Sequence, residues 1–369
     1  MTFFRLMRLL MLTMLPALVV GGVCLWNYVE DMTEPVLKPI NKSYTGYSTV
    51  PQKILGLKLE QFTFRGWDGG EVLAVIARKD GEESSRQLTI TGDLTVHKAE
   101  RLGLIDYVLI CVDWDHGIRS ALPLAESFTA AGITCVLWEP RGKDNRRAHC
   151  THGLRESADV PHLIDELTQR SGKEAPVIVG VGQGYGAGLL LQSAAIEPRL
   201  QGLICIDAYA SLRESLTRTM PDTPLTLATL SLMDLRINSS VGFECFDVAP
   251  VESAAKLDRN TPVLIVNLAQ NNPISTLEDA VNIYRQLPCD NRELWTLHNH
   301  TDAPTATTRS IRPPGATART ASVTAGLHKD EDSAVTAMVH WLNDTFITAL
   351  DTPHVHVPER PLLTSDCQL

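Results

Sequence analysis

The stretch that decides the fold reads Val177-Ile-Val-Gly-Val-Gly-Gln-Gly-Tyr-Gly-Ala-Gly188. It opens with a short apolar run rich in β-branched residues and then turns through closely spaced glycines. It continues into the apolar run Leu189-Leu-Leu-Gln-Ser-Ala-Ala195, which has helical character. This order of patterns predicts a buried strand, a sharp turn and a helix.

The glycines of this turn match a catalytic turn at every position but one. In the pattern Gly-x-Ser-x-Gly, a strained strand-to-helix turn raises a serine hydroxyl above the sheet as a nucleophile. The frame here is Gly182-Gln-Gly-Tyr-Gly186, so Gly184 stands in the serine position. Shifting the frame by two residues puts Gly182 there, which is no better. Glycine has no side chain that can attack a substrate, so the sequence predicts a kept turn without its nucleophile.

Strand patterns and helical patterns alternate on both sides of this turn. Runs that predict strands lie at residues 107–112, 133–138, 203–206, 263–266 and 293–297. Helical spacing occurs at residues 120–131, 154–169, 280–287 and 332–346. Two strand patterns around a Gly-rich turn at residues 62–78 predict a hairpin. The alternation is typical of a mostly parallel sheet covered on both faces by helices, with function at the carboxyl ends of the strands.

The first 30 residues differ from the rest of the chain. Arg5 and Arg8 precede an uncharged run from Leu9 to Val29. At ~1.5 Å per residue, a helix of this run reaches across a hydrocarbon layer ~30 Å thick. The positive flank predicts a cytoplasmic N-terminus, with the C-terminal domain outside the cytoplasm. We therefore expect residues 1–30 to form a single-pass membrane anchor; the alternative is a signal peptide that is cleaved on secretion.

Several segments outside the alternation set the expected domain boundaries. We expect a tether at residues 31–58, the main domain at 59–348 and an irregular tail at 349–369. Within the main domain, residues 209–257 lie between two strands and predict a small helical lid. Residues 301–327 contain almost no large apolar side chains and predict a mobile insertion.

The composition is that of an ordinary globular protein, with 44% apolar and 21% charged residues. A net charge of -10 argues against a nucleic-acid partner, which would need a basic face. The eight cysteines are too scattered for a disulfide scaffold, and no Cys/His spacing predicts a metal site. Cys111, Cys135 and Cys205 fall in predicted strands and should be buried thiols. Cys150, Cys245, Cys289 and Cys367 lie elsewhere, and some of them could pair if the domain is exported.

Two further patterns have plain interpretations. The glycine-rich turn fits the dinucleotide pattern Gly-x-Gly-x-x-Gly only loosely, and it follows the third or a later strand rather than the first. No cofactor is therefore expected. Three histidines, His149, His152 and His162, lack the spacing of metal ligands, and we expect them on a solvated surface.

Five stretches resemble the sequences of α/β-hydrolases in order and spacing. They are His116-Gly117, Trp138-Glu-Pro-Arg-Gly142, Thr151-His-Gly-Leu-Arg-Glu-Ser-Ala-Asp-Val160, Asp207-Ala-Tyr-Ala-Ser-Leu-Arg213 and Asp247-Val-Ala-Pro-Val-Glu252. From about Gln61 to Phe346, the chain is similar to the branch of serine aminopeptidase-like and prolyl-oligopeptidase-like esterases and peptidases. The resemblance implies the α/β-hydrolase fold with a small helical lid, here preceded by the predicted transmembrane helix.

The resemblance also implies a triad, in which a serine attacks, a histidine moves the proton and an acid orients the histidine. The serine position falls on Gly184. The acid position, after the strand that follows the lid, falls on Asn271, and an amide cannot stabilise an imidazolium as a carboxylate does. The histidine position falls on His300, with His298 and His328 as alternatives because the insertion blurs the correspondence.

Two more elements of a site follow from the resemblance. The backbone N–H groups of Tyr185 and of Gly117 or Ile118 should form an oxyanion hole. Asp207, at the end of a neighbouring strand, could compensate for the missing acid. Bare N–H groups over a pocket could still bind a carbonyl or carboxylate ligand.

The losses at Gly184 and Asn271 together favour a binding or scaffolding protein that has lost catalysis. Its ligand would be a small acyl or peptide-like molecule held under the lid. The alternative is an active esterase or peptidase, in which His300 and Asp207 activate a water molecule over the oxyanion hole. A purely structural domain that binds a partner and has a closed pocket is a third possibility.

Overall fold

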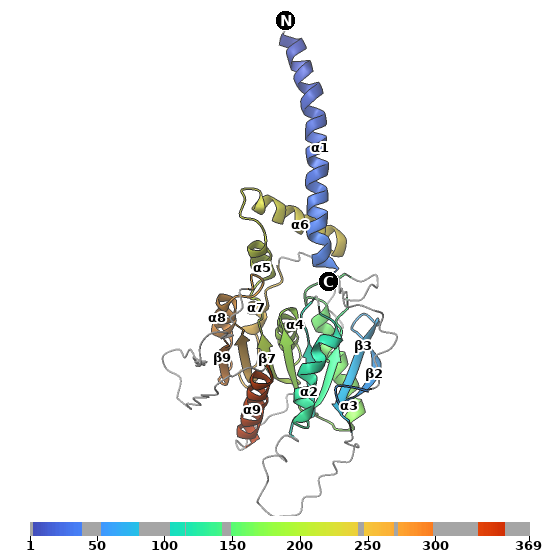
Figure 1. The fold of residues 1–369 in the computed structure, drawn as a ribbon, viewed down its shortest axis with the longest axis vertical. Helices are drawn as coiled ribbons and strands as arrows, with labels where there is room; N and C mark the ends of the chain where they lie inside the picture. The colour runs from blue at the N-terminus through green and yellow to red at the C-terminus, as the bar shows by residue number, and fades with distance from the viewer. Residues whose placement is uncertain are drawn as a thin grey trace, which may run out of the picture.

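The computed structural model describes residues 3–38, 53–80, 104–114, 116–141, 149–242, 247–268, 272–297 and 331–350. Among these residues, nine strands form one sheet at the centre of the molecule (Figure 1). The strands are β1 (Lys53–Ile54), β2 (Leu57–Arg65), β3 (Glu71–Lys79), β4 (Tyr107–Cys111), β5 (Thr134–Trp138), β6 (Ile178–Gln183), β7 (Leu200–Ile206), β8 (Val263–Asn267) and β9 (Arg292–Thr296). Their order across the sheet is β1-β2-β3-β5-β4-β6-β7-β8-β9.

The sheet is mostly parallel, as the alternation of strands and helices predicts. β2 pairs antiparallel with both β1 and β3, and β3 pairs antiparallel with β5. The remaining pairs, from β5 across to β9, are parallel. The hairpin predicted at residues 62–78 is confirmed as the pair β2 and β3. Parallel neighbours need crossover connections, and the helices supply them.

Helices cover both faces of the sheet. Those that pack directly on it include α2 (Leu122–Ala130), α3 (Asp159–Ser171), α4 (Tyr185–Ala194), α8 (Leu277–Gln286) and α9 (Glu331–Leu350). One apolar cluster joins α2 and α9 to Val108 and Ile110 of β4. The other joins α3, α4 and α8 to Leu109 and Cys111 of the same strand. Alternate residues of one strand thus face opposite layers, which is the arrangement of a buried α/β sheet.

The segment predicted as a lid, residues 209–257, contains three helices. They are α5 (Leu212–Thr219), α6 (Thr226–Val241) and α7 (Pro250–Ala254). All three follow β7, and α5 and α6 stand above the sheet in Figure 1. The predicted insertion at residues 301–327 lies outside the described residues.

The N-terminal helix α1 (Phe3–Leu37) leaves the domain as a long extension (Figure 1). It continues past the predicted boundary at residue 30, and Val29 and Val36 near its end are buried in the domain. The charges at Glu30 and Asp31 predict an end of the helix there, but Arg236 of α6 binds the Glu30 carboxylate and the helix continues. The predicted tether also contains β1 and the start of β2. Over the residues whose side chains are described, which in α1 leave out most of residues 3–13, no helix combines the length and the apolar character that crossing a bilayer requires.

The cysteines of the strands are buried, as predicted. Cys111, Cys135 and Cys205 are buried thiols in the interior of the sheet. Of the four cysteines that the sequence left open to pairing, Cys150 and Cys289 are also buried thiols. Cys245 and Cys367 lie outside the described residues. Packing therefore explains all five of the buried cysteines.

Candidate functional site

The turn between β6 and α4 is the sharp turn that the sequence predicts. Gly184 lies at its apex, immediately before α4, with φ 53° and ψ -115°. Side-chain-bearing residues rarely adopt a positive φ of this kind, and glycine does so without strain. The Gly184 N–H donates to the carbonyl of Ile206, which fixes the turn against the end of β7. A Cβ on Gly186 would lie 2.0 Å from the Cys111 carbonyl oxygen, so β4 approaches the turn closely.

The space above Gly184 is filled by the carboxylate of Asp113. Asp113 follows β4, the strand beside β6 in the sheet. A Cβ built on Gly184 would lie 2.3 Å from the carboxyl carbon of Asp113 and 2.4 Å from each of its oxygens. A serine at residue 184 and Asp113 in its present position therefore exclude one another. The missing side chain at the apex has been replaced by a carboxylate from the neighbouring strand.

The same carboxylate accepts hydrogen bonds from the turn. Asp113 Oδ1 lies 2.8 Å from the backbone nitrogen of Tyr185 and 2.8 Å from that of Trp114. Tyr185 is the residue after the apex, whose N–H the sequence assigns to the oxyanion hole. Hydrogen bonds to an ionised oxygen are stronger than those between neutral groups, so this acceptor holds both donors firmly. An anionic oxygen thus occupies the place where an oxyanion hole would receive a substrate oxygen.

A second N–H lies beside that of Tyr185, because the backbone nitrogen of Trp114 donates to the same oxygen of Asp113. The oxyanion role that the sequence assigns to Gly117 or Ile118 stays a prediction. Gly117 precedes a 3-10 helix that begins at Ile118, and its carbonyl accepts from both the N–H and the hydroxyl of Ser120. The His-Gly stretch therefore shapes the start of this 3-10 helix.

Asp207 lies close to this arrangement at the end of β7. Its Oδ1 accepts from the Leu268 N–H at 2.8 Å and from the Asn267 amide at 3.4 Å. Burial raises the pKa of Asp207, the Leu268 N–H opposes this rise, and the nearby charge of Asp113 adds to it. The charge of Asp113 thus disfavours the ionised form of Asp207.

His152 lies beneath the same residues and is fully buried. Its ring centroid is 4.6 Å from that of Trp114 and 5.9 Å from that of Tyr185. Its Nε2 lies 2.9 Å from the carbonyl oxygen of Val36, at the end of α1. Burial lowers the pKa of His152 to about 4, and the hydrogen bond to Val36 opposes this shift only in part. The imidazole is therefore neutral at pH 7 and links the base of α1 to the turn.

The prediction that His149, His152 and His162 lie on a solvated surface is wrong for His152, which is 1% exposed. His149 and His162 are half-buried. The error has a physical origin, because His152 has φ 52° and is covered by the end of α1, 116 residues earlier in the chain. No local pattern reports such a long-range contact.

Two acidic residues of the α/β-hydrolase-like stretches have structural roles. The Glu156 carboxylate accepts from the N–H of Thr151 at 2.6 Å, from the Thr151 hydroxyl at 2.5 Å and from the Gly153 N–H at 2.9 Å. Asp159 accepts from Arg141 Nε at 2.8 Å. Burial raises the pKa of both carboxyl groups, and these donors oppose the rise. These motif residues fasten loops together, so their presence is no evidence of catalysis.

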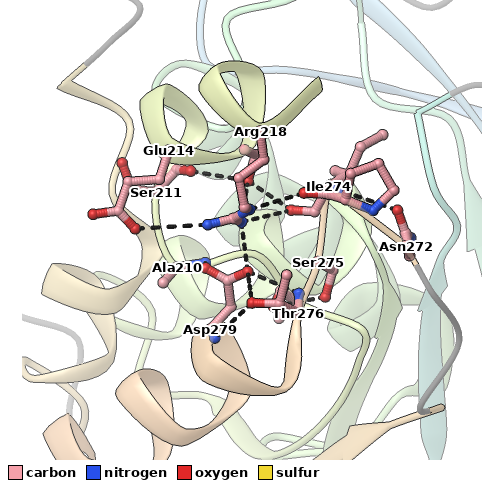
Figure 2. Close-up of polar contacts among 12 residues, drawn as sticks. Ala210, Ser211, Glu214, Arg218, Asn272, Ile274, Ser275, Thr276 and Asp279 are labelled. Atoms are coloured by element: carbon pink, nitrogen blue, oxygen red, sulfur yellow. Dashed lines mark hydrogen bonds and ion pairs between the residues drawn. The ribbon is translucent and has the colours of Figure 1, made fainter. Parts of the chain in front are cut away.

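A polar network that no sequence pattern predicts joins α5 to the start of α8 (Figure 2). Arg218 of α5 donates to Asp279 Oδ2 at 2.6 Å and to the Pro273 carbonyl at 2.9 Å. Asp279 also accepts from the N–H of Ala210 and caps α8 through Thr276. The pattern Thr-x-x-Asp at residues 276–279 is a capping-box signal that marks this helix start. Arg218, however, comes from α5, and no local sequence pattern predicts that it binds Asp279.

The remaining triad positions lie outside the described residues. These are Asn271, His298, His300 and His328. The strands that lead to the first three are described, since β8 ends at Asn267 and β9 at Thr296. Both strands run parallel to β7, so their carboxyl ends lie at the same edge of the sheet as Asp207. Over the described ranges, no group of three or more His, Cys, Asp or Glu side chains is placed to hold a metal ion.

Comparison with solved structures identifies the fold. The Pyrococcus furiosus esterase Pf2001 matches with a TM-score of 0.52 and 11% identity, over 82% of this chain and 96% of the esterase. DcsB, solved in complex with its substrate analogue, matches with a TM-score of 0.50 and 13% identity, over 78% of this chain and 100% of DcsB. No known protein family and no curated protein matches the sequence. The chain thus has the α/β-hydrolase fold, and at these identities the likeness extends to the fold alone.

Proposed function

We propose that this protein is a pseudoenzyme, an α/β-hydrolase-fold protein that binds a ligand or partner without catalysing hydrolysis. One observation carries the proposal. The carboxylate of Asp113 fills the volume that a serine side chain at residue 184 would need. It also accepts hydrogen bonds from the N–H groups of Tyr185 and Trp114. A single side chain therefore closes the two parts of the site that acyl transfer needs most.

The energetics of catalysis support this conclusion. Removing one donor of an oxyanion hole lowers the rate by about 10²–10³. Here both N–H groups already bind an anion, which would also repel the negative charge that develops on a substrate oxygen. Without a nucleophile at residue 184, covalent catalysis through this turn has no starting point.

The carboxylate also bears on the kind of ligand that the site accepts. The sequence favours a small acyl or peptide-like molecule under the lid. A half-buried Asp113 presents an acceptor rather than bare donors. We therefore favour the peptide-like ligand, because an amino or amide N–H can donate to a carboxylate, whereas an acyl oxygen cannot.

We further propose that α1 anchors the domain to a membrane through residues 1–30. The uncharged run from Leu9 to Val29 and the preceding Arg5 and Arg8 support a single pass, with the C-terminal domain outside the cytoplasm. Large apolar side chains are exposed to solvent along α1, among them Leu12, Leu15, Leu18, Val19, Val20, Val23 and Leu25. Secretion after cleavage remains the alternative.

An active esterase or peptidase is the second candidate function. The juxtaposition of Asp113 and Asp207 favours it, since burial raises the pKa of Asp207 and the charge of Asp113 raises it further. A carboxyl group with a raised pKa can take a proton from a water molecule and so activate it for attack. This mechanism forgoes the covalent intermediate and leaves the oxyanion donors occupied.

Hydrolysis of p-nitrophenyl acetate and labelling by a fluorophosphonate probe test these proposals on the purified full chain. We expect neither reaction from the natural protein or from Gly184→Ser, because Asp113 leaves no room for the hydroxyl. Gly184→Ser combined with Asp113→Ala should gain probe labelling. Turnover by the natural protein that disappears in Asp113→Asn would contradict the pseudoenzyme and support the water-based mechanism.

A further inference from the structure

The outward face of α6 is apolar and carries no charge. Its exposed side chains include Leu227, which is 70% exposed, and Leu235, which is 62% exposed, with Ala228 and Ser231 between them. Leu225, just before the helix, is 66% exposed. A helix face that points to water normally carries charged residues, and an apolar face without them indicates an interaction site.

The two charged residues of α6 do not belong to this face. Asp234 and Arg236 are both half-buried, and Arg236 turns toward α1. The guanidinium of Arg236 binds Glu30 in a bidentate manner, with Nε–Oε2 2.6 Å and Nη2–Oε1 2.7 Å. Figure 1 shows α6 crossing α1 where α1 meets the domain. This ion pair fixes the position of α6 along the axis of α1.

The position along α1 is informative because Glu30 directly follows the uncharged run that ends at Val29. If that run crosses the hydrocarbon layer, Glu30 lies at its boundary. Trp26 and Tyr28 lie within about 6 Å of Glu30 along the helix axis. Both are exposed, and tryptophan and tyrosine are enriched at the membrane–water interface. The pairing of Arg236 with Glu30 then holds α6 at the level of the lipid headgroups.

We propose that α6 lies on the outer surface of the membrane that α1 crosses, with Leu227 and Leu235 inserted at the boundary between headgroups and acyl chains. This inference rests on the membrane anchor proposed above. An interfacial helix buries its apolar face about 5–10 Å into this region. Because the face of α6 is uncharged, zwitterionic phospholipid is the occupant, and anionic lipid is not required.

The candidate site is connected to the end of α1 through His152. The end of α1 contacts His152 through Val36, and the ring of His152 packs against Trp114 and Tyr185. The turn at Gly184 is therefore attached to the part of the molecule that α1 and α6 hold at the membrane. The site lies on the membrane-facing side of the domain.

Quenching by brominated phosphatidylcholine tests the proposal on the full chain in vesicles. A fluorescent amino acid is introduced by codon suppression at residue 227 or 235, at residue 18 in α1, or at Lys173, which is exposed at the opposite end of the sheet. We expect shallow bromines to quench residues 227 and 235, deep bromines to quench residue 18, and neither to quench residue 173.

The outcomes separate this inference from the anchor itself. Quenching at residue 18 without quenching at residues 227 and 235 would overturn the interfacial role of α6 and leave the anchor standing. No quenching at residue 18 would instead remove the anchor. Emission at residue 227 that depends on protein concentration but not on lipid would assign the face to a second copy of the chain. Leu227→Glu with Leu235→Glu should reduce the quenching of a probe at Ser231 several-fold, while circular dichroism confirms the fold.

Discussion

At the scale of single residues, the glycine and the carboxylate of the turn depend on one another. Gly184 leaves the space that Asp113 fills, and Asp113 accepts a hydrogen bond from the N–H of Tyr185. A buried backbone donor without a partner costs about 1–3 kcal/mol. The carboxylate thus stabilises the turn at Gly184.

Gly184→Ala should lower the free energy of unfolding more than Gly242→Ala does. Both glycines have positive φ values, 53° and 74°, so both alanines carry backbone strain. The added methyl group meets Asp113 at residue 184, whereas nothing lies within 4 Å at residue 242. We expect the excess loss, measured by urea unfolding, to be about 1–3 kcal/mol. Asp113→Ala should reduce it in a double-mutant cycle, and equal losses at the two glycines would contradict the shared volume.

His152 should make the protein less stable as the pH falls from about 6.5 to about 4. Its pKa is lowered from 6.5 to about 4 by burial. Between these values the folded state binds fewer protons than the unfolded state, so stability rises with pH and is lost on acidification. At about 1.4 kcal/mol per pH unit, the full effect is about 3 kcal/mol.

Urea unfolding at several pH values measures this dependence. His152→Asn should flatten it, because asparagine does not titrate in this range and tolerates the left-handed backbone found at residue 152. The matched control is His162→Asn, a half-buried position on α3, which should keep the dependence of the natural protein. If the free energy of unfolding of His152→Asn changed with pH as steeply as that of the natural protein, the acid sensitivity would come from other groups.

At the scale of elements, the sequence predicted what local patterns encode. The apolar runs placed β4 to β9, and the glycine spacing placed the turn before α4, because burial on both faces leaves a continuous apolar strand. Contacts between residues far apart in the chain are not predicted by any local pattern. Asp113 reaches Tyr185 only after β4 and β6 pair, and Glu30 meets Arg236 only when α6 packs on α1. The acid and histidine positions, Asn271 and His300, remain predictions.

Arg218→Ala should loosen the lid helices while the sheet stays protected. Arg218 donates to Asp279, which is 1% exposed, and to two carbonyls of the loop before α8. Removing one partner of a buried ion pair leaves the other charge uncompensated, at a loss of up to about 3–5 kcal/mol. Because the guanidinium is 31% exposed, we expect roughly half of that.

Hydrogen–deuterium exchange distinguishes local from global loosening. We expect faster exchange in α5 and at the start of α8, with unchanged exchange in β6 and β7. Glu214→Ala is the matched control on the same helix, because its carboxylate is 61% exposed and lies 3.9 Å from Arg218. Equal effects of the two substitutions would show that the network of Figure 2 does not hold the lid.

At the scale of the whole molecule, α1 is part of the folded domain as well as an extension from it. Its last turns contribute Val29, Val36 and Leu37 to the same apolar cluster that contains α3, α4 and α6. The fold and the proposed anchor therefore share one continuous helix. The outer part of α1 is connected to α6 through Glu30 and to His152 through Val36, so a motion of the proposed anchor would reach both.

Two truncations separate the domain contribution of α1 from its outer part. A chain lacking residues 1–25 keeps the three buried side chains, and its free energy of unfolding should match that of the full chain within about 1 kcal/mol. A chain lacking residues 1–38 loses all three. At about 1.5–3 kcal/mol for each fully buried aliphatic side chain, we expect a loss of roughly 5 kcal/mol, measured by urea unfolding.

The longer truncation should also change how the domain titrates. Removing the end of α1 uncovers His152, so the pKa of its imidazole should return toward 6.5 and the acid sensitivity described above should vanish. Nuclear magnetic resonance titration of the His152 ring reports this directly. If both truncations kept the stability and the low pKa, the end of α1 would be a passive linker. If the longer truncation lowers the stability as expected, a signal peptidase could leave a stable domain only by cutting before Val29.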